Sequence, residues 1–306
     1  MDILIFIISM TALIYGADFI IQQSEKIALH YNISPFVIGA TLVAVGTSLP
    51  EMAVSISASL KGSADIAVAN VIGSTIFNIA LVLGAVFLLA KKIVPNRDLF
   101  AKDSAWALFP ILIFILMSID GKLTFLDGVL FLFLMCGFLL FLISSNQVEE
   151  PDEELKKEPF GWAKSGIFLI IGFILTIGGA DFAIESATSI ARSFGISEWL
   201  IGLFLVAFGT SLPELTISIK AALNNQADLA IGNIIGSNVA NFTMVLGLSS
   251  MVNPLNVDLS GNFFDIAAAF ILSLMLVFIT ANKMYNKSAG IALMVVFGLV
   301  IQNSFM

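Results

Sequence analysis

The sequence contains an internal duplication. Adding 163 to a residue number in the first half gives its counterpart in the second half, without a gap from Gly16 to Gly84. About half of these positions carry the same residue, far more than chance gives, which indicates a repeated structural unit. Identical stretches include Gly-Ala-Asp-Phe at 16–19 and 179–182, and Gly-Thr-Ser-Leu-Pro-Glu at 46–51 and 209–214. We expect two halves with the same local structure.

The composition places this duplication in a membrane. Of the 306 residues, 58% are hydrophobic and 12% are charged, whereas soluble domains carry about 25% charged residues. A net charge of −8 argues against nucleic-acid binding, which needs a clustered basic surface. One cysteine and one histidine give little support for a disulfide, a zinc site or histidine chemistry. We expect a lipid-embedded protein that is not an enzyme and needs no cofactor.

Apolar runs predict about ten membrane-spanning helices, since one span takes about 20 residues. No basic residue precedes the first run, so we expect a permanent span rather than a cleaved signal. An acidic linker separates a first repeat from a second. The predicted spans are 2–22, 33–60, 64–90, 104–119 and 124–145, then 163–190, 197–223, 227–251, 262–282 and 288–304; the predicted units are 1–146, the linker 147–162, and 163–306.

Five spans per half is an odd number, so the second half enters the membrane from the opposite side. The predicted fold class is an all-α membrane protein of two inverted five-helix repeats, with broken helices at the membrane midplane. With both termini outside, eleven of the fourteen Lys and Arg residues fall on the inner side, as the positive-inside rule favours. We expect a multi-pass cell-membrane protein with extracellular termini and a cytoplasmic linker.

Two carboxylates lie inside these apolar spans, at equivalent positions. They are Glu51 and Glu214, the last residues of the two Gly-Thr-Ser-Leu-Pro-Glu segments. A carboxylate at the centre of a span costs about 2.5–3.5 kcal/mol on insertion scales, so such residues usually face an ion pathway. Inverted halves would bring the two carboxylates together near the midplane. The sequence therefore predicts one cation site built from both halves.

The residues around each glutamate supply further oxygen atoms. Pro50 lacks a backbone donor and clashes with the carbonyl four residues back, so we expect a helix break that frees carbonyls around Ala44–Thr47. Glycines at 73 and 236 should let the neighbouring helices approach closely. Carboxylate, hydroxyl, amide and carbonyl oxygens suit calcium or sodium rather than zinc or copper. The predicted oxygen donors are Thr47, Ser48, Ser74 and Asn78, with Thr210, Ser211, Ser237 and Asn241.

A second interpretation of the motif is a helix cap. Ser48-x-x-Glu51 and Ser211-x-x-Glu214 match a capping box, in which serine and glutamate satisfy amides at a helix start. Two copies at membrane depth favour the ion site, although a half-helix needs a cap as well. Asp18 and Asp181, each after Gly-Ala, are expected to be structural or to lie behind the ligands.

The paired segments, each followed by Gly-Ser-x-x-x-Asn in the next span, resemble the alpha repeats of sodium/calcium exchangers in the cation/calcium antiporter superfamily. The short linker resembles that of the compact prokaryotic members. The resemblance implies that Glu51 and Glu214 bind calcium, joined by the backbone carbonyls of Thr47 and Thr210. It also implies sodium positions near these ligands, and two sliding helices, the first and sixth. The implied sodium ligands are Ala44, Thr47, Ser48 and Ser74, with Ala207, Thr210, Ser211 and Ser237.

One position departs from the family pattern. Many relatives carry an acidic residue where this chain has Asn241, whereas here both Asn78 and Asn241 are amides. Two ionised glutamates give a central charge of −2, which one calcium ion neutralises. A third carboxylate would have been able to bind a proton or an extra cation, so the identity of the co-ion stays open.

The predicted function is secondary active exchange of calcium for sodium by alternating access. The chain, expected to act as a monomer, would bind calcium and sodium ions and no nucleic acid. The main alternative is calcium/proton exchange through the same glutamates, although cation/proton exchangers usually show Gly-Asn-x-x-Glu segments. A cation channel is a remote alternative, because inverted repeats with broken helices favour alternating access.

Overall fold

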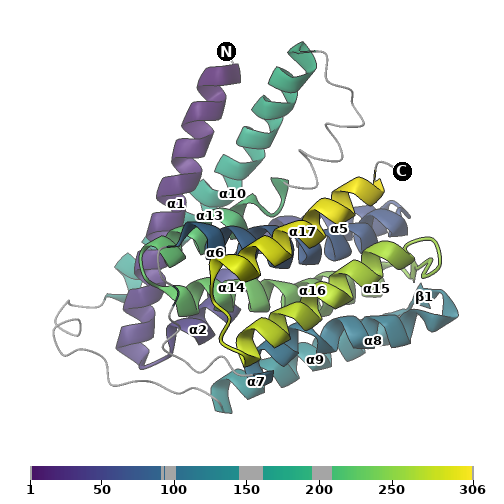
Figure 1. Ribbon diagram of the computed structural model, residues 1–306. Helices are drawn as coiled ribbons and strands as arrows, with labels where there is room; N and C mark the ends of the chain where they lie inside the picture. Colours follow the sequence, from purple (N-terminus) through teal and green to yellow (C-terminus); the bar gives the residue numbers. More distant parts are fainter. Residues whose placement is uncertain (1, 91–92, 94–100, 145–160, 195–208, 305–306) are drawn as a thin grey trace.

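The computed structural model describes residues 2–90, 93, 101–144, 161–194 and 209–304. These residues form a bundle of helices in which two long helices, α1 and α10, stand steeply against the others (Figure 1). Apart from one pair of two-residue strands, the regular structure is helical, as the sequence predicts.

The first half begins with α1 (Asp2–Tyr31), which continues well past residue 22, where the sequence analysis expected it to end. Between residues 22 and 31 the sequence contains no proline or glycine, and the helix ends at Asn32, whose φ of 56° is left-handed. The remaining elements are α2 (Pro35–Ile38), the π-helical η1 (Gly39–Val43), α3 (Ala44–Thr47), α4 (Leu49–Leu60), α5 (Ala64–Ile76), the π-helical η2 (Phe77–Leu83), α6 (Gly84–Leu89), α7 (Ala101–Ser104), η3 (Ala105–Ala107), α8 (Phe109–Met117), η4 (Ser118–Asp120), β1 (Lys122–Leu123) and α9 (Phe125–Ser144).

The second half begins with α10 (Trp162–Ser193), close to the predicted start at 163. Its described elements continue with α13 (Leu212–Leu223), α14 (Ala227–Ala240), the π-helical η7 (Asn241–Leu246), α15 (Gly247–Val252), β2 (Leu255–Asn256), α16 (Phe263–Ala281) and α17 (Lys287–Ser304). Strands β1 and β2 pair antiparallel, Lys122 opposite Asn256, and join loops of the two halves. The sequence analysis did not predict this pair.

Seven helices of the described part are long and apolar enough to cross a membrane, or eight if the bent pair Pro35–Thr47 and Leu49–Leu60 is one span. Most of the predicted ranges coincide with observed helices. Two of them do not reach the length of a full span: α17 is a shorter apolar helix, and the range 197–223 is described only from residue 209. The linker 147–162 lies almost wholly outside the described residues. The count of ten stays a prediction.

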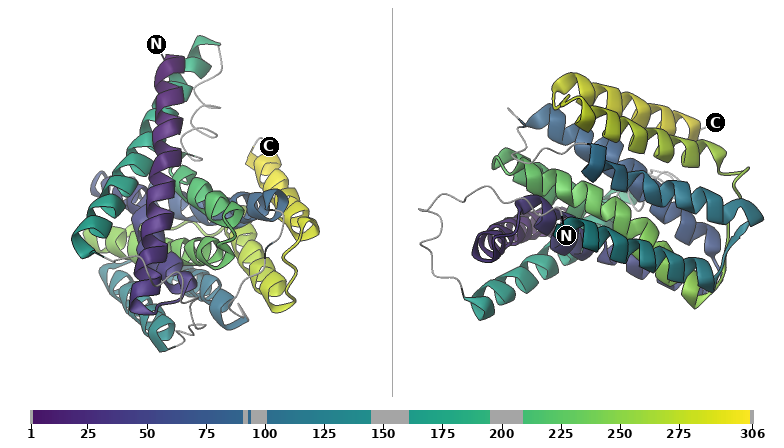
Figure 2. Two further views of the ribbon diagram at one scale, coloured as in Figure 1. Left: turned by 90° about the vertical axis from the view of Figure 1, so that its left-hand side faces the viewer. Right: turned by 90° about the horizontal axis from the view of Figure 1, so that it is seen from below.

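Helices α1 and α10 pack against each other over much of their length, and both views of Figure 2 agree with this pairing. Small residues make the contact close, because a Cβ added at Gly16 would lie 2.5 Å from Thr176 Oγ1. A Cβ added at Gly179 would lie 2.8 Å from the backbone nitrogen of Leu13. Close approach through glycine is typical of helix pairs in membranes. By contrast, the segment Ala227–Val252 lies at the centre of the bundle and is almost wholly buried.

Candidate functional site

The first Gly-Thr-Ser-Leu-Pro-Glu segment forms a break between two helices. Helix α3 ends at Thr47, Ser48 adopts φ −82° and ψ 5°, and α4 begins at Leu49, with a bend of 45° across the pair. Pro50 lies in the first turn of α4, where its missing N–H breaks no hydrogen bond within α4 itself. In the second copy Ser211 has nearly the same backbone angles, φ −91° and ψ 5°, before α13. The predicted break is confirmed in the first copy, and the second has the same local geometry.

The two serines at these breaks do not act as helix caps. Neither Ser48 nor Ser211 makes a side-chain capping hydrogen bond to its own helix. Instead Ser48 Oγ points to Glu214 Oε1 of the other half at 3.5 Å, and Ser211 Oγ points to Glu51 Oε1 at 3.5 Å. These are long contacts, yet they are reciprocal. The capping interpretation is therefore wrong for both serine side chains, which cross between the halves.

The break does not free every carbonyl that the sequence analysis expected. The carbonyl of Ala44 accepts the backbone N–H of Ser48 at 3.0 Å and the hydroxyl of Thr47 at 3.2 Å. That part of the expectation is wrong, because the helix continues through Thr47 before it bends. The carbonyl of Gly46 does lose its usual helical donor, since Pro50, four residues further on, has no N–H.

The next span of each half adds polar side chains to the same place. Ser74 Oγ donates to Glu51 Oε1 at 3.2 Å and lies 3.2 Å from Ser211 Oγ. Ser237 Oγ lies 3.4 Å from Thr47 Oγ1, again across the two halves. Asn78 lies in η2 and Asn241 opens η7, so both amides occupy π-helical segments. Such segments often occur at functional sites, because they leave the regular hydrogen-bond ladder incomplete.

The centre of this cluster is buried and incompletely hydrogen-bonded. Glu51 and Glu214 are both 0% exposed. Among the described residues no hydrogen-bond partner exists for either Oε2 atom. A buried polar group without a partner costs about 1–3 kcal/mol, and more when it is charged. Other atoms of the cluster in this condition include Asn78 Oδ1, Thr210 Oγ1 and both amide atoms of Asn241. The cluster thus presents unused oxygens with negative charge, which is the chemistry that a hard cation requires.

Four further residues, to which the sequence analysis gave no role, support the site. Asn70 donates to Ser55 Oγ at 2.9 Å and to the carbonyl of Glu51 at 3.2 Å. In the second half Asn233 donates to Ser218 Oγ at 3.0 Å. Both pairs are related by the offset of 163, so the duplication alone would have been able to reveal them.

Asn238 is a different case. It aligns with a threonine, yet its Oδ1 accepts the amide of Asn78 at 3.2 Å. The duplication gave no indication of Asn238, because the equivalent residue, Thr75, has a different side chain.

Several predicted residues are not in this cluster. Asp18 pairs with Lys220 instead, and Asp181 lines a cavity between α10 and the first break. Ala207 lies outside the described residues. Gly236 packs closely on Ala40, as predicted, with 2.3 Å from an added Cβ to the carbonyl oxygen.

At Gly73 no atom of the described residues lies within 4 Å of an added Cβ. The close helix approach that we expected at Gly73 is therefore not found among the described residues. By the offset of 163, the residue that should approach it is Leu203, which lies outside the described residues.

The fold and the cluster together define a class of protein. Apolar helices surround a polar centre in which two acidic side chains are sealed from the surface. This is the architecture of a membrane transporter for cations.

Comparisons with known proteins identify the family. A family model described as sodium/calcium exchanger protein matches residues 1–144 and 164–306. An uncharacterized membrane protein of Methanocaldococcus jannaschii is 36% identical, over 97% of this chain and 95% of that protein. Sodium/calcium exchanger MaX1 of Methanosarcina acetivorans is 30% identical, over 96% of this chain and 95% of its own length. A structure of the sodium-calcium exchanger NCX_Mj soaked with Na⁺ and Sr²⁺ matches with a TM-score of 0.85 and 35% identity, over 99% of each chain.

The chain belongs to the sodium/calcium exchanger family. It is thus a cation/calcium antiporter of the compact prokaryotic type, and not an enzyme.

Proposed function

We propose that this protein exchanges calcium for sodium across a cell membrane by alternating access. The observation that carries the proposal is the pair Glu51 and Glu214, both fully buried, each with one carboxylate oxygen that no described residue satisfies. Two ionised carboxylates in an apolar bundle are costly unless a cation neutralises them. One calcium ion matches a charge of −2, and so do two sodium ions.

We propose the following ligands. Glu51 and Glu214 hold calcium with the backbone carbonyls of Thr47 and Thr210, while Asn78 and Asn241 line the middle of the site. Sodium ions occupy adjacent positions and share some of these oxygens. Calcium and sodium therefore compete, and only differently loaded states cross the membrane. The proposed sodium ligands are Ala44, Thr47, Ser48, Ser74, Ala207, Thr210, Ser211 and Ser237. Ala44 would serve only when its carbonyl gives up one of the two hydrogen bonds that it accepts here.

Two inverted five-helix repeats would place these ligands around one axis. The reciprocal contacts Ser48–Glu214 and Ser211–Glu51 support this symmetry, because each is the other displaced by 163 in both residues. The family match leaves out residues 145–163, which supports a linker between two units. The excess of basic residues on one side supports extracellular termini. Both halves of the site come from one chain, so a monomer would suffice.

The sodium assignment is tested by calcium-45 flux in proteoliposomes, with sodium, potassium and proton gradients imposed one at a time. We expect an outward sodium gradient to drive calcium uptake, and we expect potassium and proton gradients to have little effect. Calcium flux driven by a pH jump without sodium would instead favour proton exchange through the same glutamates. A unitary conductance in a planar bilayer would favour a channel.

A further inference from the structure

The two equivalent aspartates of the duplication have different surroundings. Asp18 Oδ1 lies 2.5 Å from Lys220 Nζ, and that ammonium group also donates to the carbonyl of Ile14 at 3.0 Å. Lys220 thus ties α13, the helix that carries Glu214, to two points one turn apart on α1. In the other half, Asp181 has no ion-pair partner among the described residues. Position 57, the counterpart of Lys220, is a serine.

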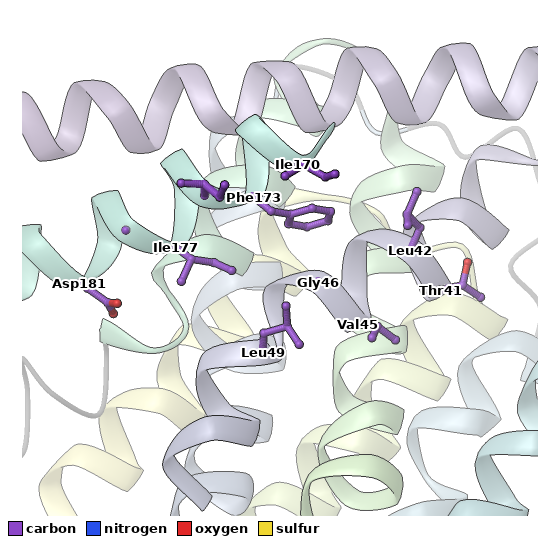
Figure 3. Close-up of a pocket in the computed structure, with 11 residues that line it drawn as sticks. Thr41, Leu42, Val45, Gly46, Leu49, Ile170, Phe173, Ile177 and Asp181 are labelled. Carbon is purple, nitrogen blue, oxygen red and sulfur yellow. The ribbon is translucent and has the colours of Figure 1, made fainter. Parts of the chain in front are cut away.

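The helix packing around the two aspartates also differs, and it is tighter around Asp18. Helix α1 packs along α13, whereas α10 makes little contact with α4 in the described part of the chain. A cavity of about 680 Å³ lies instead between α10 and the segment 41–49. Figure 3 shows Asp181 and Ile177 along the side of α10 that faces this cavity. Among the described residues, Asp18 is therefore paired with a lysine, whereas Asp181 borders the cavity.

This asymmetry has a consequence if the protein is an alternating-access antiporter with inverted repeats, as proposed above. In such transporters alternating access is largely a movement of one repeat or helix bundle against the other around a fixed site. Because the two repeats have equivalent sequences, we infer that the opposite state is the one in which their conformations are exchanged. In the opposite state α10 would pack on α4 as α1 packs on α13 here. Asp181 would then approach Ser57, which carries no charge. The ion pair would thus exist in one access state and have no equivalent in the other.

We propose that Lys220 is a positioning residue for exchange: its ion pair with Asp18 is a one-sided latch that favours the access state in which α1 lies on α13. The two side chains are 23% and 31% exposed, so water screens the pair only in part. Loss of the pair should shift the ratio of the two states by about three- to tenfold, which is at and slightly above the upper end of the range for exposed pairs.

The latch is tested by double electron–electron resonance in nanodiscs, with the full chain and no calcium. Cys136, which is exposed, is first replaced by serine, and spin labels are attached at Ile8→Cys on α1 and Leu140→Cys on α9, both at exposed positions. We expect two distance populations. Lys220→Ser should deplete the population that wild-type protein favours by three- to tenfold.

A double-mutant cycle separates the latch from general destabilisation. Asp18→Asn should give the same shift as Lys220→Ser, and the double variant should shift no further. Lys220→Arg keeps the charge and should restore the wild-type ratio. Lys61→Ser, which removes an exposed lysine from the end of α4, should leave the ratio unchanged. Unequal or additive shifts for Asp18→Asn and Lys220→Ser would overturn the proposal.

The duplication offers a further arm that adds a charge instead of removing one. Ser57→Lys should give Asp181 the partner that it lacks, and so shift the ratio toward the opposite state. That shift should vanish when Asp181→Asn is added. A shift of equal size with and without Asp181 would refute the inference.

The latch proposal and the proposed exchange function can be refuted independently of each other. Calcium-45 flux with a sodium gradient is measured on the same preparations. If wild-type protein exchanges calcium for sodium but Lys220→Ser leaves the distance populations unchanged, the latch is wrong and the exchange function stands. If the populations shift as expected but calcium does not move, the latch stands and the exchanged ions are wrong.

Discussion

Gly236 gives the sharpest test of how the bundle holds the site. This residue lies in α14 next to Ser237, and a Cβ added to it would meet the backbone of Ala40 at 2.3 Å from the oxygen and 2.6 Å from the carbonyl carbon. Ordinary contact needs about 1 Å more than the shorter distance. Because both partners are backbone, Gly236→Ala can be accommodated only if η1 and α14 move apart.

The size of the effect follows from this shift. Overpacking a tight core costs about 1–3 kcal/mol. If that cost falls on the ion-bound state, calcium affinity drops by about 5- to 150-fold. The site is sensitive to this movement, because Ser237 Oγ and Thr47 Oγ1 are already 3.4 Å apart across the two segments. A further separation of about 1 Å exceeds hydrogen-bond distance.

The assay is calorimetric titration of calcium into purified protein, together with thermal unfolding followed by fluorescence. Gly298→Ala is the matched control, since it also adds a methyl group to a helix but meets no described atom within 4 Å. We expect Gly298→Ala to bind calcium as wild type does. If Gly236→Ala keeps both wild-type affinity and wild-type thermal stability, the close packing described here does not support the site.

Three further predictions concern charge and helix packing. Glu51→Gln or Glu214→Gln should abolish calcium-45 exchange while size-exclusion profiles stay monodisperse, because one buried charge cannot balance calcium; near-normal flux in either variant would refute the site. Asn241→Asp makes the central charge −3, and the third carboxylate can bind a proton, so exchange in flux assays should become more sensitive to external pH than wild-type exchange is. Gly179→Val should slow exchange at least tenfold with wild-type calcium binding, since its side chain meets the backbone of Leu13 at 2.8 Å and disturbs the α1–α10 pair. Weakened calcium binding in that variant would instead place the fault at the ion site.

Much of the fold could be predicted from the sequence. Long apolar runs have one low-energy solution in lipid, a helix whose backbone groups are satisfied internally, so the observed helices follow the predicted ranges. Errors occur where a signal is absent. Helix α1 extends to Tyr31 because polar residues after 22 include no helix breaker. The strand pair β1–β2 is too short to leave a pattern.

Within the site, the sequence by itself determined which residues matter and in which pairs. A carboxylate in an apolar span is costly, so Glu51 and Glu214 stand out on physical grounds, and the offset of 163 relates one to the other. Side-chain direction was not determined in this way. Ser48 has the same sequence context in a capping box as in an ion site, and only the approach of the second half turns its hydroxyl toward Glu214.

The tertiary structure alone decided the contacts that break the symmetry of the duplication. Asn78 meets Asn238, and Asp18 meets Lys220, across 160 and 202 positions of sequence. Neither Asn238 nor Lys220 has a like counterpart in the first half, so the repeat gave no signal for them. The duplication specifies what the two halves share, because local sequence sets local structure. Their differences take effect only where the halves pack together.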